Sequence, residues 1–212
     1  MVPHFLQYRS ASIRERAFTL IELIVVMGVI VVVSSVILVN NSRFGGAALL
    51  QNLAYDIALS VRQAQVYGIS VRGFGVSNFS AGYGVHFDMS SPTTYVLFAD
   101  ALTVNGVYDC SNPINPTPAN CELVASTDIG RGYQISALCG TKSGNEKCDY
   151  NTLDILFKRP EPDARISASN GSEVSCTINP NQCEESARII VKSPREDEMS
   201  VAVDAVGQIR VQ

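Results

Sequence analysis

The feature that most limits how this chain can fold is an uninterrupted apolar run near its N-terminus. Between Phe18 and Val39, every side chain except that of Glu22 is apolar, glycine or a small hydroxyl. As a helix these 22 residues are about 33 Å long, enough to cross a bilayer core of about 30 Å. The sequence therefore predicts a membrane-spanning helix over residues 18–39.

Glu22 is the one ionisable residue in this run. A carboxylate inside a membrane helix costs about 2.5–3.5 kcal/mol on insertion scales, so such a residue is by default a candidate for a functional role. The cost falls when the carboxylate is paired with a cation. We therefore expect Glu22 to have a positively charged partner.

The charge distribution predicts how the chain is oriented in the membrane. Residues 1–16 carry a net charge of +2, whereas residues 17–212 carry a net charge of −6. Positively charged flanks stay in the cytoplasm, which places the N-terminus inside and the large C-terminal part outside. A cleaved signal peptide fits poorly, because the run is long and ends at NNSRF without an A-x-A-like site. An uncleaved signal anchor fits better but leaves Glu22 unexplained.

All six cysteines lie beyond the apolar run, and an even number in an exported domain indicates disulfides. Six cysteines allow 15 connectivities. Because successive cysteines enclose short polar loops, we expect sequential pairing. The expected pairs are Cys110–Cys121, Cys139–Cys148 and Cys176–Cys183. A zinc site is the competing interpretation, but no C-x-x-C spacing occurs in the chain.

The pattern of residues beyond the apolar run predicts one helix followed by strands. From Ala47 to Tyr67 apolar residues recur every three or four positions, which is typical of an amphipathic helix, and Gly68 is a natural C-terminal stop. Its polar face includes Gln65. We expect the apolar face to pack on the domain's own sheet, although it could instead line a filament. The fold class is therefore α+β, with a helix on an antiparallel sheet.

Eight later segments have the composition of short strands. They are residues 83–88, 94–100, 131–138, 153–159, 164–169, 187–193, 199–205 and 207–212.

The N-terminal segment Arg16-Ala17-Phe18-Thr19-Leu20-Ile21-Glu22-Leu23 resembles the processing site of type IV prepilins and type II secretion pseudopilins. The resemblance implies that prepilin peptidase cuts between Ala17 and Phe18 and methylates the new amino group of Phe18. It also implies that Glu22 is an assembly residue, whose carboxylate neutralises the Phe18 amine of a neighbouring subunit. The cation that Glu22 requires is then supplied by the cleavage itself.

Two features depart from the usual pattern of that family. Ala17 occupies the position before the cut, where the family usually has glycine, and no proline occurs between Pro3 and Pro92. Gly45-Gly46 is the one glycine pair near the membrane exit, where a break in the helix could occur.

A second resemblance covers most of the remaining chain. The segments VRQAQVYGISVR, GYGVHFD, YVLFAD, FKRPEPDARI and VAVDAVGQIRV resemble the GspH/FimT-like branch of minor pilins. The implied organisation is a leader (1–17), a membrane or filament-core helix (18–39), an amphipathic continuation (40–68) and an exported, disulfide-containing β-rich domain (69–212).

The resemblance implies a structural subunit of a type II secretion pseudopilus or a type IV pilus, with no enzymatic activity and no cofactor. Its expected partners are prepilin peptidase, other pilins or pseudopilins and an inner-membrane assembly platform. Its expected location is the inner membrane and then the filament. Two alternatives remain open: a pilus-tip module for DNA uptake or adhesion, and a membrane-anchored exported enzyme.

Two groups of polar residues and one histidine are weaker candidates for binding or catalysis. Asp100, Asn105 and Asp109 offer oxygen ligands for calcium, but they lack the EF-hand spacing and fit an ordinary polar turn better. Lys158, Arg159 and Arg165 form the one compact basic cluster, which fits a solvated strand end better than a nucleic-acid site in an acidic domain.

His86 is the remaining candidate. It alternates with Val85 and Phe87, so we expect a solvent-facing histidine on a strand. A pocket that combined His86 with a carboxylate would support the enzyme alternative instead.

Overall fold

The computed structural model describes residues 19–75, 79–171 and 176–212. These form two compact units, divided between Phe44 and Gly45, and each unit is described by itself. The helix α1 (Leu20–Ile69) contributes to both units. Its backbone is helical across Gly45 and Gly46, so the interpretation of this pair as a break is wrong.

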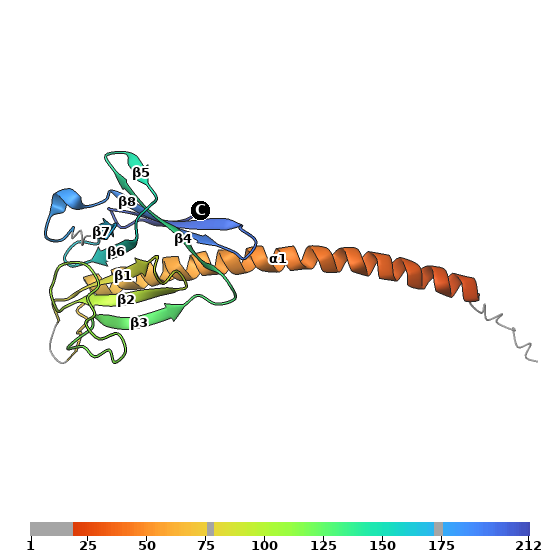
Figure 1. Ribbon diagram of the computed structural model, residues 1–212, viewed down its shortest axis with the longest axis horizontal. Helices are drawn as coiled ribbons and strands as arrows, with labels where there is room; N and C mark the ends of the chain where they lie inside the picture. The colour runs from red at the N-terminus through yellow and green to blue at the C-terminus, as the bar shows by residue number, and fades with distance from the viewer. Residues whose placement is uncertain (1–18, 76–78, 172–175) are drawn as a thin grey trace, which may run out of the picture. The chain divides into compact units, whose positions relative to one another are not determined.

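The described residues of the second unit include ten strands, which form two antiparallel sheets (Figure 1). The first sheet has the order β3-β2-β1-β6-β7 and the second has the order β10-β9-β8-β4-β5. The strands are β1 (Gly82–Asp88), β2 (Thr94–Asp100), β3 (Leu123–Asp128), β4 (Gln134–Lys142), β5 (Asn145–Lys147), β6 (Thr152–Phe157), β7 (Ala164–Ser169), β8 (Ser186–Lys192), β9 (Glu198–Asp204) and β10 (Ile209–Val211). A short 3-10 helix, η1 (Pro180–Gln182), precedes β8.

The predicted α+β class, with a helix on antiparallel sheet, is confirmed, and each of the eight predicted strands overlaps a strand of the structure. The sequence reading did not separate the strands into two sheets, and it missed β3 and β5. Both missed strands lie at sheet edges. The last four residues of β3 and all three of β5 are exposed, so neither strand carries the alternation that marks a half-buried strand.

The core of the second unit is built around α1. The buried helix residues Leu50, Ala54, Ile57, Val61 and Ala64 belong to one apolar cluster with residues of both sheets. The cluster takes Val85, Phe87, Leu153, Ile155 and Phe157 from the first sheet and Ile189, Val191, Val201 and Val203 from the second. The expectation that this helix face packs on the domain's own sheet is therefore confirmed.

Gln65 is an exception to the predicted polar face. It is only 7 % exposed, and its Nε2 donates to the carbonyl oxygens of Pro162 at 3.2 Å and Gly207 at 3.1 Å. These bonds satisfy a buried amide and tie α1 to two loops that are distant in sequence. The apolar periodicity could not show this, because glutamine counts as polar wherever it lies.

The end of α1 is packed tightly against β6. A Cβ atom added at Gly68 would lie 2.3 Å from the carbonyl oxygen of Phe157, and the Gly68 carbonyl oxygen accepts from the Arg159 N–H at 3.1 Å. Glycine is therefore required at this position because two backbones approach each other closely; the helix itself continues one residue further, to Ile69.

The cysteines form three bonds with the sequential pairing expected from their spacing: Cys110–Cys121, Cys139–Cys148 and Cys176–Cys183. The first closes the proline-rich and asparagine-rich loop between β2 and β3, and the second closes the β4–β5 hairpin. Because these cysteines are paired with one another, the zinc interpretation has no thiolates to supply ligands.

Candidate functional site

The N-terminal part of α1 has the length and composition of a membrane span. Residues Leu20–Leu38 have a mean hydropathy of 2.9, and none of their side chains is buried by the rest of the chain. The exposed side chains include those of Leu20, Ile24, Ile30 and Leu38. A helix that presents apolar side chains on all sides requires an apolar surrounding, which is either lipid or other helices.

The first turn of this helix contains a cap that the sequence reading missed. Thr19 Oγ1 accepts a hydrogen bond from the Glu22 N–H at 3.3 Å. The spacing Thr-x-x-Glu is that of a capping box, and an acidic residue in the first turn also interacts favourably with the helix dipole. Glu22 thus lies where it helps to begin the helix, so a capping role has to be separated experimentally from a role in assembly.

The residues expected at the processing site, Ala17 and Phe18, lie outside the described residues. Cleavage between them and methylation of Phe18 therefore stay predictions.

The side chain of His86 is less exposed than expected. Its side chain is 16 % exposed, and its Nδ1 is 2.8 Å from Oδ1 of Asp154, whose own side chain is 5 % exposed. The same Asp154 oxygen accepts from the Tyr108 N–H at 3.2 Å. The expectation of a solvent-facing histidine is therefore wrong: Asp154, on the neighbouring strand β6, supplies a buried partner.

Burial of the imidazole lowers the pKa of His86, but the charge of Asp154 and its hydrogen bond to the ring outweigh this effect. With a smaller contribution from Asp88, the pKa is raised above its ordinary value. Folding therefore stabilises the imidazolium form of His86 relative to the unfolded chain, because the Asp154 carboxylate lies beside it.

This pKa shift predicts a pH dependence of stability near neutrality. A raised folded-state pKa stabilises the fold below the unfolded value of about 6.5, and the gain is lost as pH rises through the folded value. The melting temperature should therefore fall between pH 6 and pH 8.5. His86→Gln should flatten that slope, because the only other histidine is His4. An unchanged slope in His86→Gln would show that another group titrates in this range.

The calcium candidates lie close together, and several of their side-chain oxygens accept hydrogen bonds, whereas the buried Asp100 Oδ2 has no partner among the described residues. Asp109 Oδ2 accepts from Thr103 Oγ1 and, at 3.0 Å, from Asn105 Nδ2, and Asp100 Oδ1 accepts from the Gly106 N–H at 3.0 Å. These bonds shape the loop that follows β2. The arrangement therefore supports the polar-turn interpretation of this segment.

Glu122, which the sequence reading missed, is the central group of that loop. It is fully buried, and it accepts from the N–H groups of Ala101 at 2.8 Å, Leu102 at 2.7 Å and Asp109 at 3.1 Å. Burial raises the pKa of both Glu122 and Asp100. No local sequence pattern marks Glu122, because its bonds depend on the fold.

The basic cluster does not form a free surface of three cations. Arg159 Nη1 donates to the Ser70 carbonyl oxygen at 3.1 Å, and the charge of Lys158 offsets part of the rise that burial causes in the pKa of Asp100. Arg165 is exposed, whereas Lys158 and Arg159 are half-buried. Only Arg165 therefore has the exposure expected of a solvated strand end.

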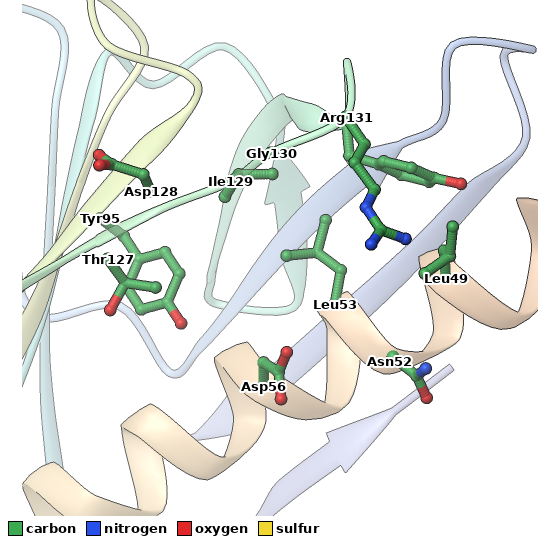
Figure 2. Close-up of a pocket in the computed structure, with 11 residues that line it drawn as sticks. Leu49, Asn52, Leu53, Asp56, Tyr95, Thr127, Asp128, Ile129, Gly130 and Arg131 are labelled. Atoms are coloured by element: carbon green, nitrogen blue, oxygen red, sulfur yellow. The ribbon is translucent and has the colours of Figure 1, made fainter.

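A cavity of about 210 Å³ lies between α1 and the loop that joins β3 to β4 (Figure 2). Figure 2 shows Arg131 reaching from that loop toward Leu49 and Leu53 of the helix. The Tyr133 hydroxyl donates to the Gly46 carbonyl oxygen at 3.0 Å. The cavity combines apolar side chains with those of Asp56, Asp128 and Arg131, and the Tyr133 bond joins the loop to the helix beside it.

Comparison with known proteins identifies the N-terminal segment. Residues 13–38 match the family described as the prokaryotic N-terminal methylation motif, which is the signature of type IV prepilins and pseudopilins. No curated protein and no solved structure matches the chain. The match covers the capped apolar helix and Glu22, together with the residues on which cleavage was predicted.

Proposed function

We propose that this chain is a minor pilin or pseudopilin. In this proposal prepilin peptidase removes residues 1–17, and the protein assembles through its N-terminal helix into a type II secretion pseudopilus or a type IV pilus. The observation that carries the proposal is that the methylation motif coincides with an exposed apolar helix whose first turn holds its one carboxylate. The segments that resemble the GspH/FimT-like branch favour a minor rather than a major subunit.

The chemistry of the helix explains how one segment serves two environments. Before assembly, lipid covers the apolar side chains of Leu20–Leu38, and after assembly the helices of neighbouring subunits replace the lipid. Neither environment solvates ions. Pairing between the Phe18 amine of one subunit and the Glu22 carboxylate of another therefore lowers the free-energy cost of burying both charges.

The proposed topology places the N-terminus in the cytoplasm and residues 45–212 outside the inner membrane. The positive N-terminal segment and the acidic remainder of the chain support this orientation. The three disulfides support it as well, since such bonds persist in oxidising compartments.

Intact-mass analysis of the membrane-extracted chain tests the processing step. The mature protein should lack residues 1–17 and carry one additional methyl group on Phe18. Ala17→Asp should block this change, because a charged residue replaces a small one at the cut. A wild-type protein that begins beyond Val39 would contradict the proposal, because the helix would then have been removed.

The enzyme alternative gains one observation, the His86–Asp154 pair. A nucleophilic mechanism would also require a hydroxyl or thiol that is hydrogen-bonded to the ring as the nucleophile. The pair alone is therefore a weaker argument for an enzyme than the methylation motif is for a filament subunit.

A further inference from the structure

Two parallel rows of polar side chains cross three neighbouring strands of the first sheet. In one row His86 on β1 lies opposite Asp154 on β6, which lies opposite Ser167 on β7. In the next row Asp88, Thr152 and Ser169 are aligned in the same way. Residues two positions apart share a face of a strand, so all six side chains lie on one face of the sheet.

This face is the one turned away from the apolar core. Val85 and Phe87, which alternate with His86 and Asp88, are fully buried in the cluster around α1. The six polar side chains, together with Val107 and Tyr108, line a cavity of about 210 Å³. We call this cavity the His86 pocket.

Hydrogen bonds from covering segments hold the His86 pocket in shape. The Tyr108 N–H donates to Asp154 at 3.2 Å, and the Cys176 N–H donates to Ser167 Oγ at 2.9 Å. Cys176 is itself fixed by its disulfide to Cys183. The walls are therefore set by backbone contacts and a covalent bond, which is the kind of preorganisation that reduces the cost of binding.

The lining restricts what the His86 pocket can hold. Its described lining contains the carboxylates of Asp88 and Asp154 and neither lysine nor arginine, so an anionic ligand would be repelled. The Asp88 carboxylate and the Thr152 hydroxyl disfavour an apolar ligand, which would displace water from them without replacing its hydrogen bonds. The volume is below the 300–1,000 Å³ usual for drug-sized ligands, so about one ring fits.

The polar groups of the pocket suit a ligand that has several hydroxyls. Asp154 is hydrogen-bonded to Nδ1 of His86, so Nε2 is the ring nitrogen that could bond to a ligand. Asp88 accepts from the Ser90 N–H at 2.7 Å and from Ser90 Oγ at 2.6 Å, and each carboxylate oxygen retains capacity for another donor. The ring of Tyr108, 5.2 Å from that of His86, adds an aromatic surface.

We propose that the His86 pocket binds a neutral, polyhydroxylated ligand the size of one sugar ring, with Asp88, Thr152 and His86 contacting its hydroxyls. This binding site is additional to the structural role proposed above and does not depend on it. The protein would then present a small carbohydrate-binding site on the surface of its exported domain.

Saturation-transfer NMR on the full chain, in a detergent without a sugar headgroup, tests this proposal. The probes are the methyl glycosides of glucose, galactose and mannose, N-acetylglucosamine, and glucuronate as the anionic comparator. At least one neutral sugar should give saturation transfer, and glucuronate should bind at least tenfold more weakly.

Asp88→Ala and Thr152→Val test where the sugar binds. Each should weaken binding by tenfold or more with little change in melting temperature, because both side chains are only half-buried. Asp128→Ala, on the edge strand β3 of the same sheet, is the matched control and should bind as wild type. The proposal is overturned if no neutral sugar binds, if glucuronate binds equally well, or if both pocket variants bind as wild type.

Discussion

Replacing Glu22 with leucine is expected to leave the chain in the membrane and abolish its incorporation into a filament. Removing a charge lowers the cost of burying the helix, so insertion should be unchanged or improved. Leader cleavage should persist, because Ala17 and Phe18 are unchanged. Assembly should fail, because the Phe18 amine of the neighbouring subunit would enter an apolar environment without a counter-charge. Crosslinking to partner pilins in membranes, together with a secretion or piliation assay, measures the effect.

Two further variants separate pairing from helix capping. Glu22→Gln removes the charge but keeps a side chain suited to the capping box, whereas Thr19→Ala removes the cap and keeps the charge. If pairing matters, Glu22→Gln should fail to assemble and Thr19→Ala should assemble. Failure of Thr19→Ala with normal assembly of Glu22→Gln would assign Glu22 a capping role. Normal assembly of Glu22→Leu would show that assembly does not require the carboxylate, which would contradict the proposed pairing with Phe18.

Replacing Ile57 with alanine is expected to destabilise the second unit, residues 45–212, by about 2–5 kcal/mol. Ile57 is fully buried on α1 and belongs to the cluster shared with both sheets, so truncation would leave a cavity at their common centre. Leu59, on the same helix, is 67 % exposed, and Leu59→Ala should change stability by no more than about 0.5 kcal/mol.

Urea unfolding of the full chain, followed by near-ultraviolet circular dichroism, compares these two variants. The Ile57→Ala midpoint should shift strongly to lower urea, while the Leu59→Ala midpoint should stay near that of wild type. Equal shifts would contradict the account of α1 as the element that both sheets cover.

The sequence predicted those elements of the fold that depend on local periodicity. Ile57 and Val61 recur at helical spacing, and Val85 and Phe87 alternate as strand residues do, so α1 and most strands could be recognised. The division into two sheets could not be recognised, because it depends on which strands pair. β4 pairs with β8, and β1 pairs with β6, across long stretches of chain.

The candidate sites show the same limit. Glu22 could be selected as a candidate because a single carboxylate in an apolar run carries a known cost, and its role in assembly stays a prediction. The cap at Thr19 was also readable, from its Thr-x-x-Glu spacing, but was missed. His86 was misplaced because its partner, Asp154, is 68 residues away and meets it only through strand register. Charge pairs of that kind are visible only once the sheet is known.

The central claim, that the apolar helix joins this chain to other pilins, is tested most directly by photocrosslinking from within the helix. A photoreactive residue at Ile30, which is 52 % exposed, would be placed in the otherwise wild-type, membrane-resident chain. The account predicts covalent adducts with other chains that carry the N-terminal methylation motif, identified by mass spectrometry. Adducts with lipid alone, under conditions in which the secretion or pilus system is active, would contradict it.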